Sequence, residues 1–110
     1  MNLSIQQQIE DFCDYFMLDI ISIEDIWSKG LGEPDVYVRV EPIPNSPFWN
    51  NDYPNAVYNI NCLFSNGRLY MQLEDLWDED YTDVEQLTDD LYNNFISDGW
   101  EYDYDKGNWE

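Results

Sequence analysis

The sequence predicts one α+β domain over residues 1–110, in which a small antiparallel β-sheet packs against two main helices and one short helix. The chain has 110 residues, 44% of them hydrophobic and 17% aromatic, which suits one core and no second domain. Two stretches, residues 4–17 and 84–95, carry apolar side chains at helical spacing. Asn66-Gly67 lies between two stretches of alternating apolar and polar residues, which is typical of a β-hairpin.

The first helix is predicted over residues 4–17. Ser4 and Gln7 have the spacing of a capping box, in which two side chains help to satisfy free main-chain N–H groups at a helix start. The apolar side chains of one face are Ile5, Ile9, Phe12, Cys13 and Phe16. We expect Cys13 and Cys62 to be reduced residues of the core.

Residues 18–27 interleave acidic and large apolar side chains. Ser22 precedes Asp25 by three positions, a loose helix-start pattern, so the simplest interpretation is a short helix that begins at Ser22. Its buried side chains would be Ile23, Ile26 and Trp27. The stretch could also be an exposed binding edge, and its spacing alone does not separate the two interpretations.

Three predicted strands follow. Residues 35–41 alternate apolar and polar side chains and stop at a proline. The hairpin then pairs residues 58–64 with residues 69–73, because Asn66 and Gly67 both tolerate the positive φ angles of a tight turn. The inner face of the first hairpin strand is predicted to be Tyr58, Ile60, Cys62 and Phe64.

Residues 45–55 have the composition of a loop, yet they include Phe48, Trp49 and Asp52. Binding side chains often lie on loops, and exposed aromatic residues are typical anchors of interfaces. The two aromatic residues could instead fold back over the core. The sequence leaves both interpretations open.

A second capping box, Thr82 with Glu85, predicts the start of the second main helix, and Gly99 predicts its end. Residues 100–105 then alternate strictly between aromatic and acidic side chains. Residues 100–110 are therefore expected to form either an edge strand with a row of carboxylates or a frayed tail.

The chain has 24 acidic and 4 basic residues and a formal charge of -20. Such a field favours positively charged partners and argues against nucleic acid as a direct partner, because phosphate contacts need Lys and Arg. We expect a cytoplasmic protein without membrane contact. The stretch from Met1 to Glu10 lacks the features of a signal peptide, and no apolar run reaches the length of a membrane span.

Signatures of catalysis are missing. No histidine is present, which removes the commonest general base and transition-metal ligand, and no pair of carboxylates has the setting of a glycosidase site. The Gly30-Leu31-Gly32 turn lacks the third glycine of a nucleotide-binding fingerprint, and residues 103–107 lack the spacing of a calcium loop. We therefore expect a protein that is not an enzyme and has no metal and no cofactor.

The acids are also predicted to form rows. Residues four apart on a helix lie about 6 Å from each other, and alternate residues of a strand about 7 Å. Glu85 with Asp89, and Glu101 with Asp103 and Asp105, therefore approach twice the ~3.4 Å phosphate step of a nucleic acid strand. The ordinary interpretation is a solvated surface, but the near absence of Lys and Arg favours mimicry of nucleic acid.

Two segments of the chain resemble the staphylococcal family of uracil-DNA glycosylase inhibitors. Residues 22–26, Ser-Ile-Glu-Asp-Ile, are similar to the family's S-I-E-E-I segment. Residues 35–42 are similar to the Y-V-R-L-G-P strand that follows it at a similar interval. The resemblance covers the chain up to Pro44, and beyond it only the order of elements is shared.

The resemblance implies a DNA-mimic inhibitor that fills the DNA-binding cleft of uracil-DNA glycosylase. Asp19, which stands where the family has a glutamate, would replace a backbone phosphate together with Glu24 and Asp25. Ile23 and Ile26 would line a pocket that takes a leucine of the enzyme. With a second contact from the loop, the expected partner-binding residues are Asp19, Ser22, Ile23, Glu24, Asp25, Ile26, Phe48, Trp49 and Asp52.

Two other functions would also use the acidic surface, but against a different target. One is inhibition of a restriction or CRISPR nuclease by DNA mimicry, as expected of a protein from a phage or another mobile element. The other is an acidic immunity protein that plugs one cognate nuclease toxin without imitating DNA. Charge alone supports both functions, and the identity of the partner would separate them.

Overall fold

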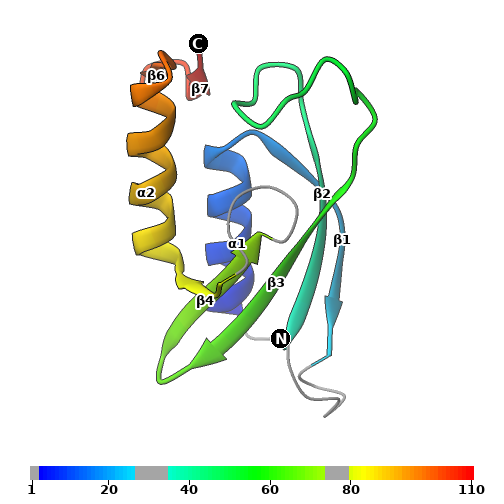
Figure 1. Cartoon of the computed structure of the whole chain (residues 1–110). Helices are drawn as coiled ribbons and strands as arrows, with labels where there is room; N and C mark the ends of the chain where they lie inside the picture. Colours follow the sequence, from blue (N-terminus) through cyan, green and yellow to red (C-terminus); the bar gives the residue numbers. More distant parts are fainter. Residues whose placement is uncertain (1–2, 27–34, 74–79) are drawn as a thin grey trace.

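A five-stranded antiparallel sheet is the centre of this computed structural model, which describes residues 3–26, 35–73 and 80–110 (Figure 1). In chain order the elements are α1 (Leu3–Tyr15), β1 (Leu18–Asp25), β2 (Val36–Pro42), β3 (Tyr58–Ser65), β4 (Arg68–Leu73), β5 (Thr82–Asp83), α2 (Val84–Ser97), β6 (Tyr102–Asp103) and β7 (Asn108–Trp109). The strand order in the sheet is β1-β2-β3-β4-β5, and β6 and β7 pair with each other.

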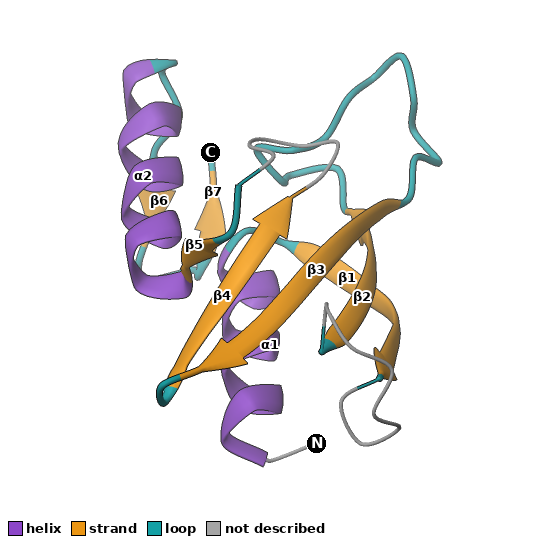
Figure 2. Ribbon diagram, turned by 60° about the horizontal axis from the view of Figure 1, so that its bottom comes forward, coloured by secondary structure: helices purple, strands orange, loops and turns teal. Residues whose placement is uncertain are grey.

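Both helices lie on the same side of the sheet, and in Figure 1 they run side by side in the same direction (Figures 1 and 2). Apolar side chains of the strands face the helices, because alternate strand residues point to opposite faces. Among the most deeply buried core residues are Ile5, Ile9, Phe16, Val38, Val40, Ile60, Met71 and Leu91. The predicted class, α+β with a small antiparallel sheet and two main helices, is confirmed.

The predicted short helix at Ser22 is wrong, because this stretch is the edge strand β1. It pairs antiparallel with β2, with Ile20 opposite Val40 and Ile23 opposite Val38. The register shifts between Ile20 and Ser22, which marks a β-bulge. Pairing with β2 satisfies the main-chain groups on one side of the strand, and this pairing takes the place of the predicted helix. Trp27, Gly30 and Gly32 lie outside the described residues.

The predicted hairpin is confirmed in place and register. β3 and β4 pair from Ile60 opposite Leu73 to Ser65 opposite Arg68. Asn66 and Gly67 form the turn with φ angles of 53° and 75°. β2 agrees with the strand predicted over residues 35–41, with Val36, Val38 and Val40 buried on its inner face.

The two main helices are confirmed, but both predicted capping boxes are wrong in detail. Thr82 belongs to β5, and the N-cap of α2 is Asp83, whose carboxylate accepts the N–H of Glu85 over 2.9 Å. α1 already begins at Leu3, and the amide of Gln7 donates to Asp11 over 2.8 Å. No described helix is long and apolar enough to cross a membrane.

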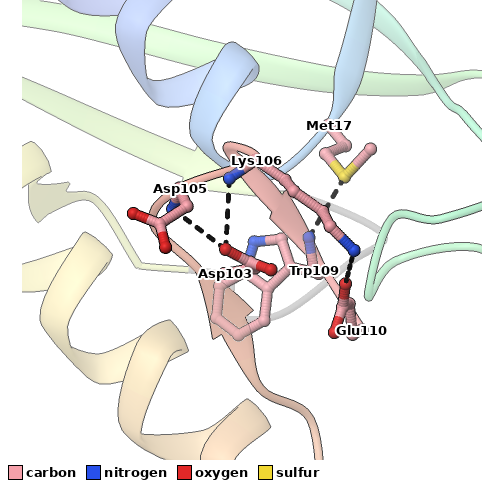
Figure 3. Close-up of polar contacts among 6 residues, drawn as sticks. All are labelled: Met17, Asp103, Asp105, Lys106, Trp109 and Glu110. Carbon is pink, nitrogen blue, oxygen red and sulfur yellow. Dashed lines mark hydrogen bonds and ion pairs between the residues drawn. The ribbon is translucent and has the colours of Figure 1, made fainter.

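The segment from residue 100 onward is neither an edge strand of the main sheet nor a frayed tail. β6 and β7 form a separate small hairpin, with Tyr102 opposite Trp109. A carboxylate oxygen of Asp103 accepts the N–H groups of Asp105 and Lys106 and closes the turn, and the Lys106 ammonium lies 3.3 Å from the Glu110 carboxylate (Figure 3). The predicted carboxylate row therefore does not form, because Asp103 is used inside its own turn.

Cys13 on α1 and Cys62 on β3 are both free and buried, as predicted. They belong to the core between the helices and the sheet. Burial as small apolar groups explains both positions without any redox or metal role.

Candidate binding edge on the open sheet face

β1 is the edge strand of the main sheet and carries the predicted acidic contacts. Among the described strands it pairs with β2 alone, so its other side offers main-chain groups to the outside. Asp19, Ser22 and Glu24 are exposed, while Leu18 and Ile20 are buried or half-buried against the core. Alternation along the strand therefore places these three polar residues on the sheet face that points away from the helices.

Asp25 does not join that face. It is half-buried and lies opposite Val36, whose side chain is fully inside the core. Paired residues of antiparallel strands point to the same face, so Asp25 lies on the helix side of the sheet. Of the three acids predicted to replace phosphates, the structure brings Asp19 and Glu24 together on one face and separates Asp25 from them.

A cross-strand pair of like charges stands at one end of this face. Asp19 is the direct partner of Glu41 on β2. Directly opposite residues have Cβ atoms about 5 Å apart, and like charges in that arrangement are destabilising. Neither carboxylate is joined by an ion pair to a base in the described part of the chain. A cation from a binding partner would relieve this repulsion.

The middle of the face is a shallow polar concavity of about 700 Å³. Two rows of cross-strand neighbours form it, one from Ser22 through Arg39 to Asn59, the other from Glu24 through Tyr37 and Asn61 to Gln72. Its described lining is Ser22, Glu24, Tyr37, Arg39, Asn59, Asn61, Gln72 and Tyr81. The Asn61 amide donates to the Gln72 side chain over 2.8 Å, which holds the floor of the concavity in place.

The apolar side chains that this edge exposes were not predicted from the sequence. Ile21 is the extra residue of the bulge and is 50% exposed, and Tyr37 beside Glu24 is 39% exposed. Two consecutive isoleucines break the strict alternation of a strand, and that break is the signal for a bulge. A bulge redirects a side chain, and here it leaves an apolar residue outside on an otherwise acidic edge.

The two isoleucines predicted to line a leucine pocket point elsewhere. Ile23 is half-buried and packs against the core, opposite the buried Val38. Ile26 is 7% exposed, and its N–H donates to the carbonyl oxygen of Asp35 over 2.9 Å. Both side chains contribute to the protein's own interior, so among the described residues of this edge the large exposed apolar side chains are Ile21 and Tyr37.

The loop between β2 and β3 divides its predicted contacts between core and surface. Phe48 packs edge-on against Phe95, with ring centroids 5.0 Å apart, and caps the core. Ser46 anchors this arrangement, because its buried hydroxyl donates to the carbonyl oxygen of Phe16 over 2.6 Å. Trp49 is half-buried, and Asp52 is exposed. Phe48 therefore folds back over the core, which is one of the two interpretations that the sequence left open. Asp52 remains available to a partner.

Within the described residues, no group of three or more acidic or cysteine side chains is arranged to hold a metal ion. No family model, curated protein or solved structure matches this chain. The resemblance to the staphylococcal inhibitors therefore stays a prediction.

Proposed function

We propose that this protein is a non-catalytic DNA mimic that binds and blocks the DNA-binding cleft of uracil-DNA glycosylase. The observation that carries the proposal is the like-charged pair of Asp19 on the edge strand β1 and Glu41 on the neighbouring strand β2, in a chain of formal charge -20. A cationic cleft that evolved to hold phosphates would stabilise these carboxylates, whereas in the free protein they repel each other.

The spacing of the acids along β1 also fits the proposal. Asp19 and Glu24 lie on one face, and their partners on β2 are four residues apart because of the bulge, which corresponds to about 13 Å along a strand. One strand of DNA carries about four phosphates over that length at ~3.4 Å per step. The edge therefore offers negative charge over about four steps of a DNA backbone, without the flexibility of an acidic tail.

The proposal also includes apolar contact at the same edge, which simple attraction between opposite charges would not require. The resemblance assigned such contact to Ile23 and Ile26, but in the part of the edge that the structure describes the large exposed apolar side chains are Ile21 and Tyr37. In our proposal these two side chains meet the apolar residue that the enzyme inserts into DNA. Charge would then govern the rate of association, and the desolvated apolar contact would govern how slowly the complex dissociates.

A titrated inhibition assay tests the proposal. Uracil excision from duplex DNA is measured with increasing amounts of this protein, at low and at high salt, with polyglutamate at equal charge concentration as the control. We expect stoichiometric inhibition by the protein and far weaker inhibition by polyglutamate. If excess protein leaves excision unchanged at low salt, the proposed target is wrong.

A pull-down from a bacterial lysate distinguishes the remaining targets. The protein should recover the glycosylase from the lysate. Recovery of a large nuclease complex without a glycosylase would instead support inhibition of a restriction or CRISPR nuclease. Recovery of one small nuclease toxin would support the immunity function.

A further inference from the structure

A groove lies between α1 and α2, away from the edge strand and the open sheet face. Its volume is about 550 Å³. It shares Asp11 and Tyr15 with a hollow that reaches Tyr102, and Val84 and Glu85 with a hollow that reaches Arg68. These two hollows therefore border the groove, one on the side of Tyr15 and the other on the side of Val84.

The groove has an apolar floor and acidic rims. Half-buried Tyr15 from α1 and Val84 at the start of α2 supply the apolar surface of the floor, and Phe12 also lines it but is only 3% exposed. Exposed carboxylates stand on both sides, Asp11 from α1 and Glu85 and Asp89 from α2. The described lining of the groove contains no Lys and no Arg. A ligand that fits must combine apolar groups with positive charge.

The base nearest to the groove is already engaged. Arg68 lines the hollow at the end where α2 begins, and its guanidinium lies 3.2 Å from the Asp83 carboxylate. The other shared hollow adds Asp14 to the acidic side chains. Acidic side chains therefore line the groove and both neighbouring hollows. Arg68, the one base among their described lining residues, forms an ion pair with Asp83.

The dimensions of the groove suit a helix. Its lining runs from Gln8 to Tyr15 along α1 and from Val84 to Asp89 along α2, which corresponds to about 8 to 10 Å at ~1.5 Å per residue. Two neighbouring helices leave a valley between them, and a third helix packs into such a valley at an axial distance of about 8 to 10 Å. An amphipathic helix would cover the apolar floor with residues at positions i, i+3 or i+4, and i+7.

We propose that this groove docks a basic amphipathic helix of a partner protein. Apolar side chains of that helix cover Tyr15 and Val84, and its flanking Lys and Arg residues meet Asp11, Glu85 and Asp89. A second copy of this chain does not fit, because its charge of -20 would be repelled by the same rims. The inference goes beyond the proposed inhibition, since the groove lies on the helix side of the sheet and leaves β1 free.

Two synthetic peptides of identical Leu and Lys composition test the proposal against the full chain. One has all its Leu residues on one helical face, and the other has a scrambled order without an apolar face. Binding is followed by calorimetry and by amide chemical shifts. We expect the amphipathic peptide to bind more tightly and to shift the amides of Gln8, Asp11, Thr88 and Asp89. Equal binding of both peptides, or shifts confined to β1, would overturn the proposal.

Matched variants separate the groove from the general negative field. The groove variant combines Asp11→Asn, Glu85→Gln and Asp89→Asn. The control combines Glu10→Gln, Asp90→Asn and Asp98→Asn, which removes the same charge outside the described groove lining. The groove variant should weaken binding of the amphipathic peptide about tenfold and the control about twofold or less. Equal losses would show that the peptide senses only the total charge.

Discussion

The indole N–H of Trp109 donates a hydrogen bond to the carbonyl oxygen of Tyr15 over 2.8 Å, which joins the last hairpin of the fold to the end of the first helix. The Trp109 ring is 1% exposed and stacks on Phe16 with centroids 6.0 Å apart. Its main-chain N–H lies 3.5 Å from the sulfur of Met17 (Figure 3). The hairpin therefore supplies a central part of the core.

Replacement of Trp109 by Ala should lower the free energy of unfolding by about 3 to 5 kcal/mol, because a large buried ring and its hydrogen bond are lost. Urea denaturation followed by circular dichroism measures this change. Tyr53→Ala is the control, since Tyr53 is 67% exposed, and we expect a change within about 0.5 kcal/mol. Equal stability of the Trp109 variant and the wild type would refute the packing of this hairpin.

Asp83 should contribute to stability at neutral pH and lose that contribution in acid. Partial desolvation works to raise the pKa of its carboxyl, but the N–H of Glu85 and the Arg68 guanidinium outweigh it, so the pKa is lowered. Because the pKa is lower in the folded state than in the unfolded state, ionised Asp83 stabilises the fold at pH values above the unfolded pKa of about 3.9. This contribution is lost as the pH falls through the pKa of the folded state.

Asp83→Asn keeps a capping side chain but removes the charge. We expect the wild type to be more stable than this variant at neutral pH, by less than about 1 kcal/mol because the site is near the surface. The difference should shrink as pH is lowered from about 5 to about 3. Urea titrations of both proteins across this range measure it, and a difference that grows in acid would contradict the assignment.

The two thiols should be unreactive in the native protein. Burial, with smaller contributions from Asp14 and Glu10, raises the pKa of Cys13 to about 12, and burial also raises the pKa of Cys62. Since the thiolate is the nucleophile, Ellman's reagent at mildly alkaline pH should label both cysteines in urea and neither on the same timescale in buffer. Rapid labelling without denaturant would show that the core is open.

Salt should change stability and binding in opposite directions. The 24 acidic residues repel one another in the folded chain, and added salt shortens the screening length to about 8 Å at physiological ionic strength. The melting temperature should therefore rise with sodium chloride, while inhibition of the glycosylase weakens. Calorimetry and the inhibition assay in the same buffers give both trends, and a fall of the melting temperature would contradict this account.

Glu24→Lys should weaken inhibition much more than Glu101→Lys. Glu24 lies on the proposed binding edge, whereas the exposed Glu101 precedes the last hairpin. We expect a loss of roughly 10- to 100-fold for the first variant, because a charge in a desolvated contact is reversed, and about twofold for the second. Circular dichroism checks that both variants fold. Equal losses of inhibition would indicate that the enzyme responds to the total negative charge of the protein and not to a defined binding edge on β1.

Elements with strong local signals were predictable from sequence. Asn66 and Gly67 adopt positive φ angles with little strain, so their hairpin depends on a few neighbouring residues. The apolar faces of the two main helices repeat at helical spacing and needed no information from distant residues. The strand at residues 36–42 was clear for the same reason, since valines on one face alternate with exposed or half-buried residues.

The wrong predictions concern segments whose structure depends on contacts with residues that are distant in the chain. Ser22 and Asp25 imitate a helix start, but β1 forms because β2 pairs with it. Thr82 has capping-box spacing, yet it pairs with Met71 in the sheet, and Asp83 becomes the cap. Residues 100–105 alternate as a strand would, but burial of Trp109 against α1 folds this end of the chain into a separate hairpin. In each case a long-range contact overrode a weak local pattern.

By itself the sequence determined the α+β class, the two helices, the hairpin and the acidic character, because local spacing and composition carry these properties. The tertiary structure alone decided which acids share a face. Pairing with β2 set Asp19 beside Glu41, and the bulge turned Ile21 outward while Asp25 went to the helix side. A binding surface depends on strand register, and register arises from contacts between residues that are distant in the chain.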